Sequence, residues 1–262
     1  DAVEEIIRSV GTADGLKCLM EKIPDLERIV GRISAGSASP RDVRALAGGL
    51  EMVPAMREIL ACAGSALVRD VYRKMDPREE VCARVDTTLV REPPGKLVDG
   101  GVIAQGVDPE LDELRLLRKD SRQWIAELEA HEREQTGIST LKIGYNKVFG
   151  YYIEISGTHA HKAPDRYMRK QTLTNAERFI TPELKEYESK ILGAQDAIAR
   201  IEARIFTELL NFLIGWIPHL KETISAIACI DALNSLALLA VEKGYERPDV
   251  ESGRSILIRA GR

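Results

Sequence analysis

Residues 181–205 carry the pattern that most constrains the fold of this chain. After Thr181-Pro182, apolar side chains recur at alternating spacings of three and four: Leu184, Tyr187, Ile191, Ala194, Ile198, Ile201 and Ile205. This spacing places all of them on one stripe of an α-helix, as in the seam of a coiled coil. The segment therefore predicts a long helix that packs lengthwise against another helix.

A second long helix is predicted earlier in the chain. Asp108-Pro109 combines an N-cap residue with a proline at the first helical position. Apolar residues then recur down to about Gln135, at Leu114, Leu117, Trp124 and Leu128. Such a helix would be about 27 residues, or roughly 40 Å, long.

The segment between these helices has a different period. Apolar residues alternate with polar or small ones over residues 141–145 and again over 151–156. A period of two on both sides of the turn segment 146–150 is typical of a β-hairpin. We therefore expect a small sheet at the far end of two helical arms.

The remaining sequence is typical of a helical bundle. Over residues 1–90, helix starts are expected at Pro24 and at Ser39-Pro40. Residues 91–106 hold two prolines and four glycines, which predicts a loop. The expected fold class is mainly α: a helical bundle with two long lever helices that carry a small β-containing insertion. Both ends of the chain are expected to be internal to a longer protein.

Bulk properties exclude several classes of protein. The net charge is −4 and the pI about 5.8, so a nucleic-acid site has to be local. The cysteines show neither disulfide nor zinc spacing, which favours reduced thiols and a cytoplasmic protein. No signal peptide is visible. The most apolar stretch, 223–241, contains Asp231 and falls short of a membrane span.

Positive charge gathers in one part of the chain. Residues 141–181 carry seven lysines and arginines against three carboxylates, and six of the thirteen aromatic residues. Because phosphates need cations and short polar donors, this composition suits contacts with a nucleic-acid backbone. A solvated charged face over an aromatic core would have the same composition, and charge alone leaves both interpretations open.

Two stretches carry a resemblance to a known family. Leu141-Lys-Ile-Gly-Tyr-Asn-Lys-Val-Phe-Gly-Tyr-Tyr-Ile-Glu-Ile-Ser156, followed by Tyr167-Met-Arg-Lys-Gln-Thr-Leu-Thr-Asn-Ala-Glu-Arg-Phe-Ile-Thr-Pro-Glu-Leu-Lys-Glu186, closely resembles the clamp signature of the MutS family of DNA mismatch-repair proteins. Residues 24–29, 100–104 and 110–114 resemble lever-region motifs of that family. The motifs occur in the family's order over nearly the whole chain.

The resemblance implies a domain organisation along the chain. Residues 1–118 and 182–262 would form the core and lever helices, and residues 119–181 the clamp, which touches duplex backbone and not bases. The family's DNA-contacting positions fall on Asn146, Lys147, Lys170, Thr174 and Asn175, and the adjacent cation, Arg169, is included with them. Thr174 stands where the family often has a lysine, and it is a weaker donor.

The expected function is therefore non-specific binding of duplex-DNA backbone as the lever and clamp part of a MutS-type protein. The resemblance implies a parent protein that is a homodimer, uses ATP with Mg²⁺, meets a MutL-type repair partner, and works in the cytoplasm at the nucleoid, away from membranes. No P-loop occurs in this sequence, so we expect neither enzymatic activity nor a cofactor in this chain. The alternative is a structural coiled-coil module whose basic tip binds an acidic protein, although such a site would not require the Asn and Thr donors.

Three further signals favour ordinary structural roles. Phe206-Thr-Glu208 matches the family's three-residue mismatch wedge, but so short a motif on a seam helix favours packing. His159 and His161 lack a third ligand, so no metal site is expected. Asp231 is expected to be hydrogen-bonded in the core, not catalytic.

Overall fold

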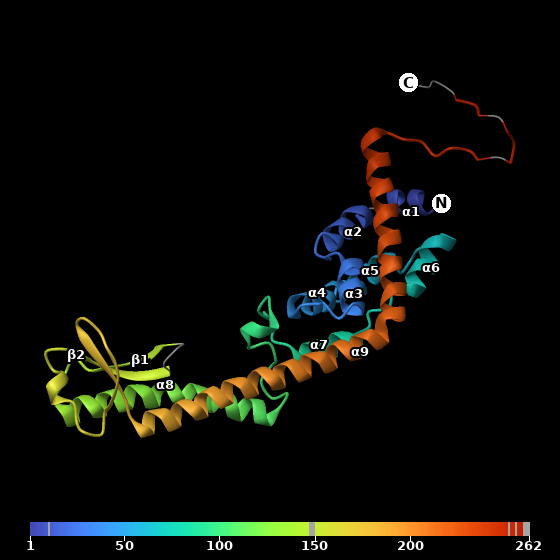
Figure 1. The fold of residues 1–262 in the computed structure, drawn as a ribbon. Coiled ribbons are helices and arrows are strands. Elements are labelled where there is room, and N and C mark those ends of the chain that lie inside the picture. The colour runs from blue at the N-terminus through green and yellow to red at the C-terminus, as the bar shows by residue number, and fades with distance from the viewer. Residues whose placement is uncertain (10, 147–149, 251, 255, 259–262) are drawn as a thin grey trace. The chain divides into compact units, whose positions relative to one another are not determined.

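The computed structural model describes residues 1–9, 11–146, 150–250, 252–254 and 256–258. The chain divides into two compact units (Figure 1). One comprises residues 1–38, 42–86 and 210–262, and the other comprises residues 39–41 and 87–209. The functional division at 118/119 and 181/182 stays a prediction.

The first unit is built from short helices and the second half of one long helix. Its elements are α1 (Ala2–Arg8), α2 (Thr12–Met20), α3 (Leu26–Ser34), α4 (Pro40–Leu50), α5 (Val53–Leu60), α6 (Ala66–Lys74), α7 (Glu79–Thr88) and the later turns of α9 (Pro182–Lys243). The helix predicted to start at Pro40 does so. The start predicted at Pro24 is wrong by two residues, because Asp25 caps α3 by accepting a hydrogen bond from the Arg28 N–H at 2.9 Å.

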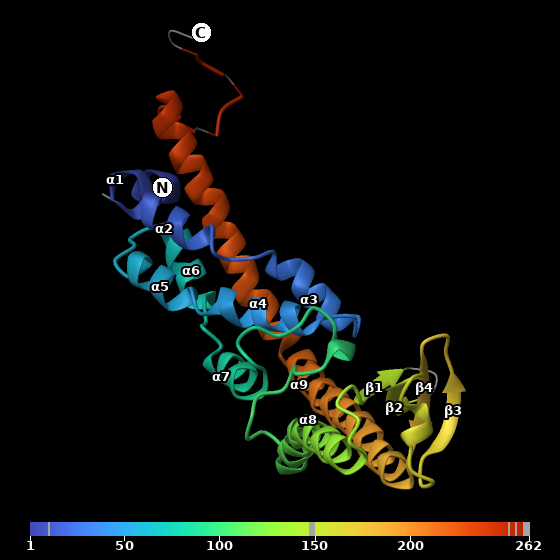
Figure 2. The ribbon, with the colours of Figure 1, turned by 90° about the vertical axis from the view of Figure 1, so that its left-hand side faces the viewer.

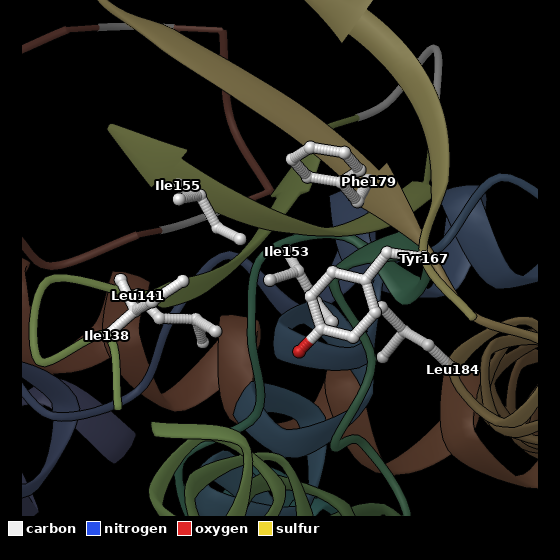
Figure 3. Packing of buried hydrophobic residues seen from close by; sticks show 7 residues of the cluster. All are labelled: Ile138, Leu141, Ile153, Ile155, Tyr167, Phe179 and Leu184. Carbon is white, nitrogen blue, oxygen red and sulfur yellow. The ribbon is translucent and has the colours of Figure 1, made fainter. Parts of the chain in front are cut away.

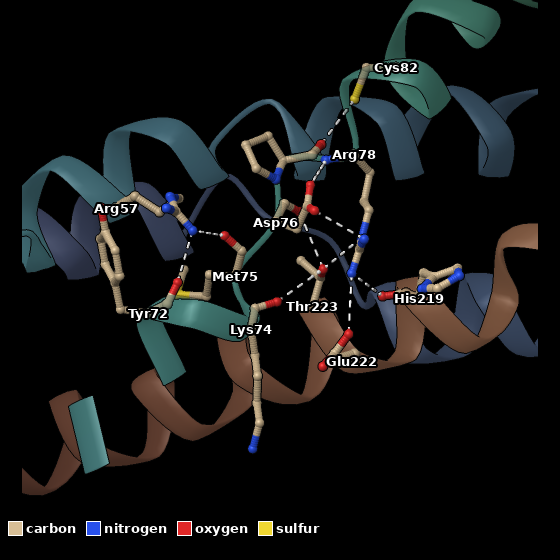
Figure 4. Close-up of polar contacts among 11 residues, drawn as sticks. Arg57, Tyr72, Lys74, Met75, Asp76, Arg78, Cys82, His219, Glu222 and Thr223 are labelled. Carbon is tan, nitrogen blue, oxygen red and sulfur yellow. Dashed lines mark hydrogen bonds and ion pairs between the residues drawn. The ribbon is translucent and has the colours of Figure 1, made fainter. Parts of the chain in front are cut away.

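Arg78 ties the turn after α6 to α9 (Figure 4). It is the one described non-glycine residue with positive φ, at 54°. Its Nε donates to Thr223 Oγ1 at 3.2 Å and its Nη2 to the carbonyl oxygen of His219 at 3.1 Å. Ion pairs with Asp76 and Glu222 complete the set. The guanidinium thus holds the region of α9 that follows Pro218, the proline inside the helix.

The apolar part of α9 differs from expectation in two ways. An 18-residue stretch of α9 has a mean hydropathy of 2.0, so α9 is long and apolar enough to cross a membrane. The core helix of a soluble protein can meet the same criterion of length and composition. Asp231 is exposed and not hydrogen-bonded in the core, because a carboxylate is costly to bury without partners. Asn234 is buried in this stretch, and its Nδ2 donates to the Ala13 carbonyl oxygen at 3.1 Å.

The second unit is organised by α8 (Pro109–Thr136) and the first half of α9, which run side by side (Figures 1 and 2). Asp108 caps α8 through the Leu111 N–H at 3.0 Å, as the sequence predicts. The rings of Trp124 and Tyr187 stack with centroids 3.5 Å apart. Six of the seven predicted seam residues of α9 are buried and Tyr187 is half-buried. Leu117 of α8 departs from the predicted stripe, since it is 49% exposed.

Residues 91–106 form the predicted loop, with one short 3-10 turn, η1 (Leu97–Asp99). The loop is closed by an isolated antiparallel bridge between Leu89 and Ile103. A hydrogen bond from the Val90 N–H to the Val102 carbonyl oxygen, at 3.0 Å, belongs to this closure.

Between α8 and α9 lies a four-stranded antiparallel sheet in the order β1-β2-β4-β3. Its strands are β1 (Lys142–Asn146), β2 (Gly150–Ser156), β3 (Met168–Thr172) and β4 (Ala176–Ile180), and η2 (Ala160–Lys162) lies in the β2–β3 connection. The predicted hairpin is confirmed, and β3 and β4 are additional. The expected fold class, mainly α with a small β insertion between two long helices, is confirmed.

Candidate nucleic-acid interface

One face of the sheet is apolar and packs onto the helices. Ile153 and Phe179, which pair across β2 and β4, belong to a buried cluster (Figure 3) whose other members are Ile138, Leu141, Ile155, Tyr167 and Leu184. Trp124, Ile125 and Leu128 of α8 pack against this cluster. The apolar face is therefore occupied, and a ligand has to meet the opposite face, an edge or a turn.

The opposite face carries a row of paired polar residues. Lys142, Glu154, Arg178 and Gln171 are in register across all four strands. Arg178 Nε lies 2.8 Å from Glu154 Oε2, and its Nη1 lies 3.2 Å from Gln171 Oε1. The guanidinium also stands over the Tyr152 ring, 4.2 Å from its centroid. Arg178 is thus a structural cation of the sheet, although composition alone counts it with the phosphate-binding candidates.

The β3 edge presents two of the predicted contact residues. The Arg169 side chain is 60% exposed and pairs with Glu177 at 2.9 Å. Lys170 is exposed and sits at the register shift between Arg169 and Gln171. In the part of the chain that the structure describes, Lys170 makes no ion pair. A bulge on an edge strand discourages pairing with a further strand and leaves its side chains accessible.

The turn between β3 and β4 presents two more of the predicted contact residues. Thr174 and Asn175 are both exposed. The turn is closed by a hydrogen bond from the Leu173 N–H to the Ala176 carbonyl oxygen at 2.8 Å. The Asn175 carbonyl oxygen accepts from the Gly157 N–H at 3.0 Å. The turn is therefore fixed through its backbone while its hydroxyl and amide side chains point to solvent.

Asn146 lies elsewhere on the sheet. It ends β1 and pairs with Gly150 at the start of β2, whereas Ser156 at the end of β2 pairs with Ala176 beside the β3–β4 turn. Six residues of β2 separate these two levels, which is roughly 20 Å at 3.3 Å per residue. The structure thus groups Arg169, Lys170, Thr174 and Asn175 on one hairpin and places Asn146 at the other end of the sheet. Lys147 lies outside the described residues.

Gly150 holds the β1–β2 hairpin close to α9. Its φ of 75° is a left-handed conformation that glycine adopts without strain. A Cβ at this position would collide with the Glu188 carboxylate of α9. The left-handed φ is what favours glycine here, because the Glu188 carboxylate is the end of a flexible side chain and can move aside. The sequence signal for this position is the glycine that ends the turn segment.

The structure also places Phe206 and His159, which belong to two motifs with possible functional roles in the sequence. Phe206 is buried in the second unit, in agreement with a packing role. His159 Nδ1 lies 3.0 Å from Ser156 Oγ. Within the described ranges, no three His, Cys, Asp or Glu side chains gather where a metal ion could bind.

Known proteins are similar to this chain in sequence along its whole length. Residues 106–197 match the family model described as MutS family domain IV. All of the chain aligns with "DNA mismatch repair protein MutS" of Pelotomaculum thermopropionicum at 44% identity, and with the same-named proteins of Desulforamulus reducens at 42% and Lachnoclostridium phytofermentans at 40%. The chain covers 30%, 30% and 28% of these relatives, so it spans less than a third of their length.

Proposed function

This chain belongs to the MutS family, and from that premise we propose that its four-stranded sheet is a clamp that holds duplex DNA by the phosphate backbone. In this proposal α8 and the first half of α9 are the levers that carry the clamp. The contacts are to phosphates and sugars, so they hold matched and mismatched duplexes alike.

The observation that carries the proposal is the β3–β4 hairpin. It brings two cations, Arg169 and Lys170, together with the hydroxyl and amide of Thr174 and Asn175, all exposed on an edge strand and its turn. Cations neutralise phosphates, and short polar side chains donate to phosphate oxygens. The bulge at Lys170 supports this role, because it keeps the edge from being capped by another strand.

Arg169 is compatible with the role despite its ion pair with Glu177. The Arg169 side chain is 60% exposed and pairs with Glu177 through Nε, whereas the Glu177 side chain is only 16% exposed. Because an unpaired carboxylate is costly to bury, the ion pair would be kept, and a phosphate would meet the remaining N–H donors of the guanidinium. Asn146, with Lys147, would supply a second set of contacts at the other end of the sheet.

The lever role is supported by the packing below the sheet. The apolar face of the sheet rests on Trp124, Ile125 and Leu128 of α8, and α8 in turn stacks on α9 through Trp124 and Tyr187. Because these partly buried side chains pack against the buried cluster below the sheet, a displacement of α8 would carry the sheet with it.

We further propose that the chain has no catalytic activity and no cofactor of its own. In this proposal the whole protein works as a homodimer that uses ATP and Mg²⁺ in DNA mismatch repair, meets a MutL-type partner, and is cytoplasmic. Saturable binding of ATP by this chain, measured by calorimetry, would contradict the first part.

Fluorescence anisotropy with labelled duplexes tests the clamp. The chain should bind a matched duplex and a G·T duplex equally, with a Kd on the order of 10⁻⁴ to 10⁻⁶ M at physiological salt. Tenfold discrimination between the duplexes would overturn backbone-only contact. Polyglutamate of equal charge serves as competitor, and competition as strong as that of unlabelled duplex would favour an acidic protein as the partner.

A further inference from the structure

A buried carboxylate of α8 holds the chain just before β3. Glu132 is 2% exposed, and its Oε2 accepts hydrogen bonds from Tyr167 Oη and from Arg166 Nη2, each at 2.6 Å. Arg166 Nη2 also donates to Gln135 Oε1 at 2.8 Å. Because a carboxylate is buried at large cost unless it is paired, these contacts specify where residues 166 and 167 lie on α8.

Tyr167 makes this attachment part of the core. Its ring packs 5.8 Å from that of Phe179 in the buried cluster below the sheet. Burial, the hydrogen bond to Glu132 and the charge of Glu132 raise the pKa of the Tyr167 phenol. The phenol therefore stays protonated and donates to Glu132 throughout the physiological pH range.

The other edge strand has its own attachment to α8. Glu129 Oε2 accepts from the Ile143 N–H at 2.7 Å, at the start of β1. Arg133 Nε donates to the Leu141 carbonyl oxygen at 2.7 Å, and its Nη2 pairs with Glu129 at 2.7 Å. The two edges are thus fastened separately, β1 by Glu129 and Arg133 and β3 by Glu132.

We propose that Glu132 is a positioning residue for DNA binding, which fixes Arg169 and Lys170 by anchoring Arg166 and Tyr167. This role rests on the proposed clamp function. Tyr167 and Lys170 are three residues apart in nearly extended chain, roughly 10 Å, so little slack separates the anchor from the contacts. Loss of the anchor should release the β3 contacts and leave β1, with Asn146, in place.

A double-mutant cycle tests the proposal, with duplex affinity and its salt dependence measured for the unmodified chain, Glu132→Gln, Lys170→Ala and the double variant. Lys170→Ala should reduce the log-log salt slope by about 0.9 in the unmodified chain, for one phosphate contact, and have much less effect in the Glu132→Gln background. Glu132→Gln alone should reduce the slope by about 1 to 2, because Arg169 is displaced as well. Glu134→Gln, the same charge change at an exposed position of α8, is the matched control and should leave the slope unchanged.

The outcomes separate the two proposals. If the unmodified chain binds duplex and the two substitutions are additive, the role of Glu132 is wrong and the clamp stands. If the unmodified chain does not bind duplex, the clamp and the role of Glu132 both fall. If the amides of Ile153 and Phe179 lose protection from exchange in Glu132→Gln, Tyr167→Phe replaces it in the cycle. Tyr167→Phe removes one donor to Glu132 and keeps the carboxylate paired with Arg166. Coupling between Tyr167→Phe and Lys170→Ala would support the role of Glu132, and additivity would overturn it.

Discussion

Glu202 of α9 accepts hydrogen bonds from the backbone N–H of Gly101 on both of its carboxylate oxygens, at 3.1 and 3.0 Å. The side chain of Glu202 is 1% exposed. Arg115 of α8 donates from Nη2 to Glu202 Oε1 at 2.7 Å and to the Ile103 carbonyl oxygen at 2.8 Å. The glycine-containing loop, α8 and α9 therefore meet at one buried carboxylate.

Substitution of Glu202 by alanine should destabilise the second unit substantially. It leaves the Gly101 N–H without its acceptor and Arg115 without its carboxylate. Because Arg115 is a quarter exposed and regains water, we expect a loss of about 2 kcal/mol in the free energy of unfolding, below the 3–5 kcal/mol typical of a fully buried pair.

Urea unfolding measures this loss. Glu208→Ala, which removes an exposed ion pair with Arg204 further along α9, is the control and should cost about 0.5 kcal/mol or less. Equal losses for the two variants would contradict a special role for Glu202.

Gly150→Ala should disturb the β1–β2 hairpin. A non-glycine residue in the left-handed region costs roughly 1–2 kcal/mol, and the added Cβ also forces the flexible Glu188 carboxylate to move aside. We expect lower stability and weaker duplex binding, measured by urea unfolding and anisotropy. Gly157→Ala is the control, since its added Cβ meets Asn175 only at 3.8 Å. A Gly150→Ala variant as stable as Gly157→Ala would show that the hairpin tolerates a side chain.

The long helices and the first hairpin could be predicted because periodicity reports them directly. The seam of α9 and the cap at Asp108 are local signals, and both are confirmed. The strands β3 and β4 give no such signal. Met168-Arg-Lys-Gln-Thr172 is an edge strand with no buried residue, and β4 buries only Phe179, so neither shows the alternation that identifies a strand.

The sequence could predict which residues belong to the candidate site, but not how they are arranged on the sheet. The resemblance supplies Asn146, Lys170 and Asn175, yet their separation depends on the strand order β1-β2-β4-β3, which follows from a long connection after β2. Arg178 and Glu132 were missed as structural groups, because a charge gives no sign in the sequence of whether it is paired inside the fold. The sequence signal for Glu202 was its place between Ile198 and Ile205, at helical spacing on the buried stripe of α9.

Because Asp108 caps α8, the free energy of unfolding should depend on pH in the acid range. A hydrogen bond from the Leu111 N–H lowers the pKa of Asp108, and the Arg204 side chain, 2.8 Å away, lowers it further, while desolvation opposes both. A carboxyl whose pKa is lower in the folded than in the unfolded state stabilises the fold above its unfolded value, about 3.9. That contribution is lost as pH falls through the folded pKa.

Asp108→Asn keeps a capping oxygen and removes the charge. The variant should unfold at lower urea than the parent chain at pH 6–7, and the difference should shrink towards zero as the pH falls below the unfolded pKa of about 3.9. Asp99→Asn, at an exposed aspartate with no ion pair in the described part of the chain, should show no such pH-dependent difference. A difference for Asp108→Asn that persists unchanged at low pH would mean that the charge is not its cause.

Replacement of single lysines should reveal how many phosphates the clamp neutralises. Lys170→Ala and Lys147→Ala should each weaken binding equally on matched and G·T duplexes, because a phosphate contact carries no sequence information. Each contact releases a condensed counterion, so each substitution should reduce the slope of log K against log salt by about 0.9. Lys22→Ala, an exposed lysine in the first unit, makes the same change in net charge and is the control. A loss at Lys22 as large as at Lys170 would mean that overall charge drives binding, since the hairpin is unaltered in that variant.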